Sequence, residues 1–390
     1  MKKIKQLLGG DFRQFSMVIA LVVLLVFFHV ASGGKMITPA NMQNLISGNA
    51  YVLVLAIGML MVIVIGHIDL SVGPVAGFAG MVMALSARDL GLPWWVAVFV
   101  GLAVGVVAGM FHGFFLSRLD IPGFITTLGG MMIFRGAVIW ISGSISVPAP
   151  RELRFFGAGY LPDWGREITG LNNVTIILGL LAIILFAYFQ LKKRKRIAEL
   201  TGNTEEMWIV LSRIVLVSGV ILYVSWLFAS GRKGTSFPIP GVILLVLVFI
   251  YHTLTQRTRL GRHIYAVGGN KASAALSGVN VKNIYFFTMF NMSLLAALAG
   301  IMFVGRATAA GPSDGTGWEL DAIASVFIGG AAVSGGVGTV TATMVGGLVM
   351  AVLNSGLMLL GVGSDKTQVI KGFVLLGAVA LDVYNKKKRK

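Results

Sequence analysis

Long apolar stretches separated by short polar ones dominate the chain and set its expected architecture. A helix needs about 20 mainly apolar residues to cross the hydrocarbon core of a bilayer. Two segments, 72–86 and 321–334, are short for a straight crossing. We therefore expect an all-α polytopic membrane protein, a single domain over 1–390, with 10–12 transmembrane helices, re-entrant pieces being the alternative to full crossings. The twelve apolar segments are 16–32, 50–66, 72–86, 94–117, 124–142, 174–190, 208–230, 241–256, 283–304, 321–334, 341–361 and 368–384.

One apolar run is interrupted by Gly and Pro. Residues 66–74 read Gly-His-Ile-Asp-Leu-Ser-Val-Gly-Pro and divide the run from 50 to 86. Such a break persists at membrane depth only where it is buried in protein or lines a cavity. Asp69 is ionisable beside the hydrocarbon region and is therefore a functional candidate. The alternative is that Asp69 caps the N-terminus of the short helix 72–86.

A related pattern occurs in the second half of the chain. Residues 319–324, Glu-Leu-Asp-Ala-Ile-Ala, precede a short apolar run that ends in Gly329-Gly330, and Ser-Gly-Gly-Val-Gly follows at 334–338. Paired short segments in two halves indicate a transport path near the middle of the bilayer. Asp321 is thus a second candidate.

Two other features lie inside the apolar segments. Arg135, within 124–142, must pair with a carboxylate or with carbonyls, and Asp69 is a possible partner. Arg135 is either a structural clamp between helices or a substrate contact, and the sequence favours neither role. Gly101, Gly105 and Gly109 share one helix face, which favours close helix packing.

Composition and charge narrow the class. Apolar residues make up 56% of the chain and charged residues 12%, which excludes a water-soluble enzyme, a disordered chain and a nucleic-acid binder. With both termini in the cytoplasm, 20 of the 32 basic residues fall on the cytoplasmic side and 9 outside, as the positive-inside rule requires. The first apolar segment, after Met1-Lys2-Lys3, is either an uncleaved span, which we favour, or a signal peptide.

The sequence contains no recognisable motif for catalysis or for binding a metal or nucleotide. It has no Cys, no phosphate-binding G-x-x-x-x-G-K-[ST], no H-E-x-x-H, and five scattered His. We therefore expect no catalytic residue, no metal site and no cofactor bound by this chain.

Four motifs carry a family resemblance. They are Gly66 to Gly73, residues 121–129 (Ile-Pro-Gly-Phe-Ile-Thr-Thr-Leu-Gly), residues 320–338, and the ordered-looking cytoplasmic loop 257–282 with Gly261 to Val279 at its centre. Together they resemble sugar ABC importer permeases of the ribose/xylose (multiple monosaccharide) family, a group similar to branched-chain amino-acid permeases.

The resemblance implies a permease homodimer in the bacterial inner membrane. It implies a cytoplasmic ATP-binding subunit that holds ATP and Mg²⁺, and a periplasmic sugar-binding protein. Residues 268–279 would form the coupling helix that docks into the ATPase. The coupling candidates are Gly269, Asn270 as a helix cap, and the small residues Ala274, Ala275, Ser277 and Gly278; the acid common in this motif is absent.

The expected function is import of a monosaccharide, a pentose such as xylose or a hexose. Neutral sugars suit a transport path with few charges. The residues expected to line this path are Asn41, Asn44, Thr127, Asp69, Arg135 and Asp321. For Asn41, Asn44 and Thr127 the alternative role is that of a helix cap or a helix-packing group. An ion-coupled secondary transporter, a branched-chain amino-acid ABC permease and a structural membrane protein are the competing interpretations.

Overall fold

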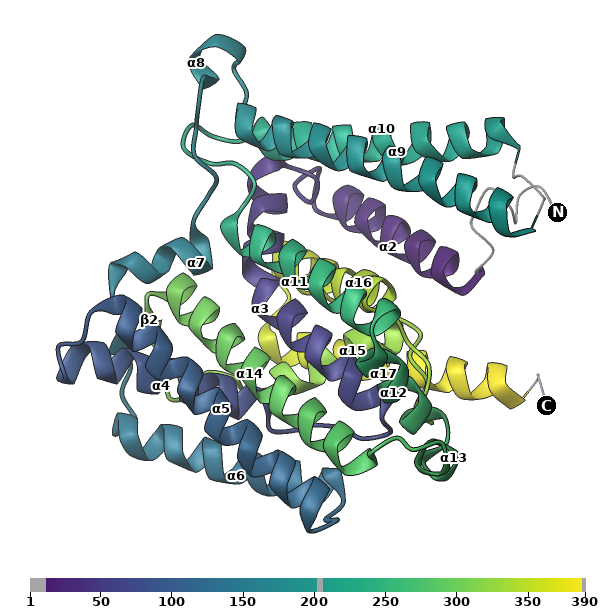
Figure 1. Ribbon diagram of the computed structural model, residues 1–390. Helices are drawn as coiled ribbons and strands as arrows, with labels where there is room; N and C mark the ends of the chain where they lie inside the picture. Colours follow the sequence, from purple (N-terminus) through teal and green to yellow (C-terminus); the bar gives the residue numbers. More distant parts are fainter. Residues whose placement is uncertain (1–11, 202–205, 388–390) are drawn as a thin grey trace.

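A computed structural model describes residues 12–201 and 206–387, which form a bundle of helices (Figure 1). Each apolar segment coincides with a helix. The expected all-α polytopic class is confirmed. The helices concerned are α2 (Phe12–Ala31), α3 (Pro39–Val64), α4 (Val72–Asp89), α5 (Trp94–Arg118), α6 (Gly123–Ser142), α9 (Asn173–Thr201), α10 (Met207–Ala229), α11 (Ile239–Arg257), α14 (Val281–Ala307), α15 (Trp318–Ile328), α16 (Val340–Leu359) and α17 (Ser364–Lys387).

The helices differ in whether they can cross a bilayer. Within the described residues, eight are long and apolar enough: α3, α5, α6, α9, α10, α11, α14 and α16. In contrast, α15 has 11 residues, which is about 16 Å at 1.5 Å per residue, roughly half of a 30 Å hydrocarbon core. The short segment at 321–334 is therefore a half-span.

Two helices extend beyond their apolar segments. α3 begins at Pro39 rather than near 50, because Thr38 accepts a hydrogen bond from the Asn41 amide and Pro39 occupies the first turn. α9 continues beyond residue 190 to Thr201, through the basic residues at 192–196. Hydropathy alone underestimated both helices because their ends are polar.

The two ends of the bundle are distinct. One end carries the short pair β1 (Val147–Pro148) and β2 (Ala309–Ala310), with η1 (Arg151–Leu153), α7 (Arg154–Ala158) and α8 (Arg166–Thr169). The other carries α12 (Arg259–Gly269) and α13 (Lys271–Leu276), with the start of α2 and the end of α17 on the same side, at the right of Figure 1. This placement agrees with both termini on one side; Lys2, Lys3 and Lys5 lie outside the described residues.

The core is centred on α3 and α14, whose most apolar stretches are 78% and 72% buried. α14 packs against α3, α4 and α5, and α3 also packs against α15. The α5 glycines form the expected packing face: a methyl group added at Gly105 would lie 2.6 Å from Cβ of Ala297, and one at Gly109 would lie 2.8 Å from Cα of Phe290. Main chain therefore approaches main chain along α5 and α14.

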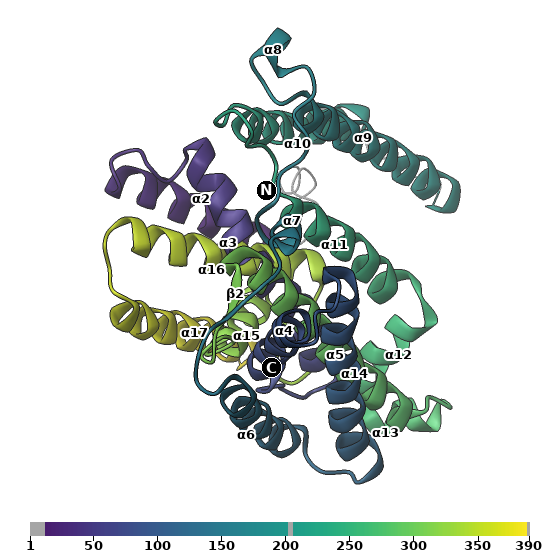
Figure 2. The same ribbon diagram turned by 90° about the vertical axis from the view of Figure 1, so that its left-hand side faces the viewer.

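The hairpin of α9 and α10 lies at the edge of the bundle (Figure 2). Only 11% of the most apolar stretch of each helix is buried. The chain enters and leaves this region through two adjacent segments: the Leu161 amide donates to the Phe237 carbonyl at 3.2 Å, and the Ile239 amide donates to the Gly159 carbonyl at 2.8 Å. Residues 161–237 thus leave the bundle and return to it at one place, where these two hydrogen bonds join the two ends of the segment.

Candidate functional site

The first helix break lies between α3 and α4. α3 ends at Val64, Gly66 has φ +83°, and α4 begins at Val72. Asp69 is fully buried, and its Oδ1 accepts from the Ser71 amide at 2.8 Å and from the Ser71 hydroxyl at 2.6 Å. Asp69 therefore shapes the turn that precedes α4, rather than bonding to the N–H groups of the helix itself.

The second break, residues 311–317, precedes α15 and is held by Asp314 and Arg135. The Asp314 carboxylate accepts from the Gly311 amide at 2.7 Å, and the Arg135 guanidinium donates to the Asp314 carbonyl at 2.8 Å. Of the two kinds of partner expected for Arg135, a carboxylate or carbonyls, the structure shows a carbonyl, and Asp69, the possible carboxylate partner, bonds to Ser71 instead. Arg135 thereby ties α6 to the second break.

The two breaks cross each other inside the bundle. A methyl group added at Gly73 would overlap the carbonyl oxygen of Gly315, and one added at Gly77 would lie 2.5 Å from the carbonyl oxygen of Asp314. Gly315 has φ +81°, a conformation that disfavours any other residue. The break that the sequence indicated at 66–74 is thus part of this crossing, whereas the glycines that it indicated at 329–338 follow α15.

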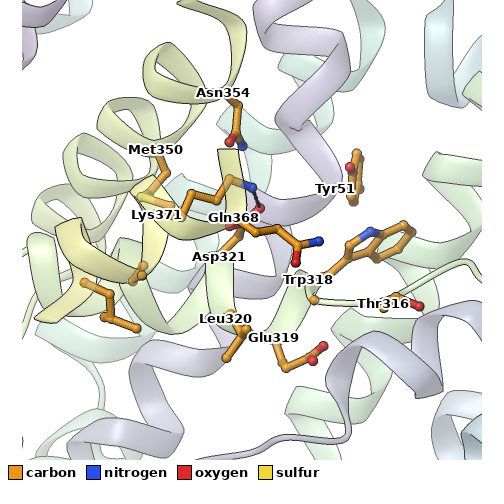
Figure 3. A pocket seen from close by; sticks show the side chains of 14 residues that line it. Tyr51, Thr316, Trp318, Glu319, Leu320, Asp321, Met350, Asn354, Gln368 and Lys371 are labelled. Atoms are coloured by element: carbon orange, nitrogen blue, oxygen red, sulfur yellow. Dashed lines mark hydrogen bonds and ion pairs between the residues drawn. The ribbon is translucent and has the colours of Figure 1, made fainter. Parts of the chain in front are cut away.

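A pocket of about 560 Å³ lies between α3, α15, α16 and α17 (Figure 3). Its central polar contact is an ion pair: Lys371 Nζ of α17 lies 2.9 Å from Asp321 Oδ2 of α15. The two side chains are 23% and 12% exposed, so the pair is largely withdrawn from solvent. The lining residues are Tyr51, Thr316, Gly317, Trp318, Glu319, Leu320, Asp321, Ala324, Met350, Asn354, Gln368, Lys371, Gly372 and Leu375.

Aromatic rings and unsatisfied polar atoms complete this pocket. The Trp318 ring packs against Tyr51 with centroids 4.4 Å apart and against Phe303 at 4.6 Å. Asn354 Oδ1 and Glu319 Oε2 are buried and have no hydrogen-bond partner among the described residues. Buried polar atoms are normally paired, so Asn354 Oδ1 is available to a bound molecule, whereas Glu319 Oε2 faces Gly73 of α4. A mostly apolar wall with a few such groups is typical of small-molecule pockets.

The expected path residues do not converge on this pocket. Asp321 lines it, whereas Asp69 and Arg135 belong to the two breaks. Within the described residues no group of three or more metal-ligating side chains comes together.

The remaining three path candidates have structural roles or lie elsewhere. Asn41, at the first turn of α3, donates to the Met36 carbonyl at 2.8 Å and accepts from the Ser355 hydroxyl at 3.3 Å. Asn44 is exposed on the next turn. The Thr127 hydroxyl donates to the carbonyls of Gly123 and Ile68, which fastens α6 to the first break. None of the three lines the pocket.

Sequence reasoning missed several pocket residues. Lys371 offered a signal, since an ionisable side chain within an apolar segment marks a functional candidate. Tyr51, Asn354 and Gln368 offered none, because aromatic and amide side chains are common in transmembrane helices. Only the packing of α17 against α15 brings them together.

The cytoplasmic loop forms two capped helices. Thr258 Oγ1 accepts from the Gly261 amide at 3.1 Å at the start of α12, and Asn270 Oδ1 accepts from the Ser273 amide at 2.9 Å at the start of α13. The expected cap at Asn270 is confirmed. Burial raises the pKa of the Tyr265 phenol in α12, so the hydroxyl keeps the proton that it donates to the Gly338 carbonyl at 2.7 Å.

One coupling candidate is misplaced by the sequence. Ala274 is only 4% exposed and packs inward, because α13 is a true helix with one face against the bundle. The other small residues of the surface, Ala275, Ser277 and Gly278, are exposed, as are Gly269 and Asn270. Leu276, which sequence reasoning passed over, is 91% exposed and is the prominent apolar side chain of this surface.

Comparison with known proteins gives consistent results. Residues 41–379 match the family described as branched-chain amino acid transport system / permease component. The chain is 34% identical to the xylose transport system permease protein of Haemophilus influenzae, with 96% of this chain and 97% of the relative covered. It is 34% identical to the xylose transport system permease protein of Escherichia coli K12 (96% and 92% covered). It is 32% identical to the ribose import permease protein of the same strain (94% and 93% covered). No solved structure matches significantly.

Proposed function

The chain belongs to the family of branched-chain amino acid transport system permease components, and from this premise we propose that it carries a monosaccharide across the bacterial inner membrane as the membrane subunit of an ABC importer. The relatives that cover almost the whole chain are named for xylose and ribose transport. A pentose such as xylose is therefore the first candidate substrate, followed by a hexose.

The observation that carries the proposal is the composition of the pocket at mid-bundle. Neutral sugars present an apolar ring face and several hydroxyls. Trp318 and Tyr51, whose rings are tilted by 50° to each other, supply an aromatic wall, while Asn354 supplies a buried acceptor atom without a partner. A pocket of about 560 Å³ lies in the 300–1,000 Å³ range usual for small-molecule sites.

A branched-chain amino acid is the second candidate, and one observation favours it. The pocket contains a carboxylate and an ammonium group side by side, Asp321 and Lys371. Separated by a ligand, these two groups would match the ammonium and carboxylate of a zwitterion. The description of the family agrees with this alternative.

Partners follow from the same family membership. We propose that a cytoplasmic ATP-binding subunit, which holds Mg²⁺ and ATP, docks on α12 and α13, where Leu276 is exposed. A periplasmic sugar-binding protein would approach the opposite end, at β1, β2 and α7. Two copies of the chain would form a homodimer, and membrane lipid would cover the exposed faces of α9 and α10.

Uptake measurements test the proposed function. In cells that lack this permease, re-expression should restore ATP-dependent uptake of radiolabelled xylose or another monosaccharide. Asn354→Ala should lower that uptake at least tenfold at equal membrane levels, because it removes a pocket acceptor. Met358→Ala, one turn along α16 and 69% exposed, is the matched control and should leave uptake unchanged.

Competition separates the two substrate classes. Excess unlabelled leucine should not reduce xylose uptake if the pocket accepts sugars. Loss of leucine uptake rather than of sugar uptake in the deletion strain would refute the sugar proposal and favour the amino acid.

A further inference from the structure

Three chain segments meet main chain to main chain beside the cytoplasmic helices. A methyl group added at Gly268, near the end of α12, would overlap the carbonyl oxygen of Val64, the last residue of α3. The Gly336 amide donates to the same Val64 carbonyl at 2.8 Å. A methyl group added at Gly336 would lie 2.9 Å from Cα of Gly269. We call the contact of Val64, Gly268 and Gly336 the glycine seam.

Side chains reinforce the glycine seam on both sides. The Tyr265 hydroxyl of α12 donates to the Gly338 carbonyl at 2.7 Å. Lys271, at the start of α13, lies over the Tyr285 ring with Nζ 5.2 Å from the ring centroid. The same ring packs edge-on against His67 of the first break at 4.9 Å. α12 therefore touches the end of α3 and the loop that follows α15, and α13 reaches the first break through the Tyr285 ring.

Each segment of the glycine seam leads to a different part of the transport machinery. From Val64 the chain continues into the first break and α4. Gly336 and Gly338 follow α15, whose opposite end carries Trp318, Asp321 and the pocket. α15 is a helix of 11 residues, about 16 Å long, and it joins the loop at Gly336 to the pocket.

We propose that the glycine seam, with Tyr265, is the contact through which movement of α12 and α13 reaches both helix breaks and, through α15, opens or closes the pocket. Gly268, Gly336 and Tyr265 are positioning residues in this scheme. The proposal rests on the proposed function for its motor, the ATP-binding subunit, but not on the identity of the substrate. Contacts between backbones suit this role because no side-chain rotamer lies between the moving parts to absorb the displacement.

Two glycines provide the test, one in the glycine seam and one far from it on α10. Gly268→Ala places a methyl group against Val64, whereas an added methyl group at Gly219 meets nothing within 4 Å. A spin label attached at Leu320→Cys on α15, which is 53% exposed, reports motion at the pocket end; the natural sequence has no cysteine to compete. The sample is the full complex with its ATP-binding subunit and sugar-binding protein.

We expect ATP to change the spectrum of the label in the wild-type sequence and in Gly219→Ala, and to change it at least fivefold less in Gly268→Ala. The yield of sugar imported per ATP hydrolysed should fall by a similar factor in Gly268→Ala, while co-purification of the ATP-binding subunit is retained. An unchanged ATP response in Gly268→Ala, or no response in the wild-type sequence, overturns the proposal.

A second variant tests the proposal if Gly268→Ala fails to fold. Tyr265→Phe removes only the hydroxyl that reaches Gly338 and should lower the sugar-to-ATP yield severalfold with normal complex assembly. A wild-type yield in Tyr265→Phe would overturn the role of Tyr265. Failure of the proposed function would look different: the label would respond to ATP, yet no monosaccharide would be imported.

Discussion

At the scale of single residues, the ion pair of Asp321 and Lys371 is the most consequential polar contact in the pocket. Each side chain neutralises the charge of the other in a site that is largely shielded from solvent, so the loss of one leaves the charge of the other unpaired. A hydrogen bond to a charged group contributes about 2 kcal/mol, and the residual exposure of both side chains (12% and 23%) keeps the cost in this range.

Asp321→Asn should therefore lower the unfolding temperature of the purified protein and reduce uptake. The double variant Asp321→Asn with Lys371→Met should recover the unfolding temperature, because no unpaired charge remains, but not uptake, because the pocket has lost its polar centre. Thermal denaturation in detergent and uptake in cells measure the two effects. Equal unfolding temperatures for the wild-type protein, the single variant and the double variant would show that the ion pair does not contribute to the stability of the fold.

The α5 glycines give a second prediction at this scale. Gly105→Ala should destabilise the protein by about 1–3 kcal/mol, since an extra methyl group 2.6 Å from Ala297 forces α5 and α14 apart. Gly129→Ala on α6 is the matched control, because nothing lies within 4 Å of the added group. Urea or thermal unfolding should rank the control at or above the wild-type sequence.

Residues also mark the limit of what the sequence could predict. Asp321 was recognised because a carboxylate next to an apolar run is rare, and the α5 glycines because their spacing defines one helix face. Tyr51 and Asn354 have no such pattern, and the pocket exists only because α17 packs against α15. The contact of Gly268 with Val64 joins residues about 200 positions apart, and no local periodicity encodes it.

At the scale of elements, hydropathy identified every apolar helix but located polar helix ends poorly. The first eleven residues of α3 contain Asn41, Gln43 and Asn44, which lower hydropathy without preventing a helix, and its start is set by the Thr38 cap. The shortness of α15 was visible from sequence because glycines follow it directly. Its position against the first break required the fold.

The hairpin of α9 and α10 should be dispensable for assembly. Its base is closed by main-chain hydrogen bonds that join residues 159–161 to 237–239, and its helices are largely exposed. Joining Leu161 directly to Phe237 should give a protein that inserts in the membrane and retains at least a third of the uptake. Removing the comparable α5–α6 hairpin, residues 94–142, should abolish insertion because α5 packs closely on α14. Degradation of the first deletion would contradict this prediction.

At the scale of the whole molecule, the bundle has a cytoplasmic end with α12, α13 and both ends of the described chain, and an outer end with β1 and β2. The excess of basic residues on the first side fixes this orientation.

Labelling of single cysteines in intact cells tests the orientation. A membrane-impermeant maleimide should modify Ile168→Cys on α8, which is 90% exposed, and should not modify Ala272→Cys on α13 until the membrane is permeabilised. The opposite pattern would reverse the topology. The natural sequence without cysteine serves as the background control.

The aromatic wall of the pocket has an optical consequence. Of the seven tryptophans, all within the described residues, Trp318 alone is buried; Trp94, Trp95, Trp140, Trp164, Trp208 and Trp226 are 37–84% exposed. Lipids with brominated acyl chains quench indole fluorescence on contact, so they should darken the tryptophans of the lipid-facing surface and spare Trp318. The light that survives quenching then comes from Trp318 and from Trp164, which lies next to α8 outside the membrane-spanning helices, and the part from Trp318 provides an intrinsic signal for the arrival of cargo in the pocket.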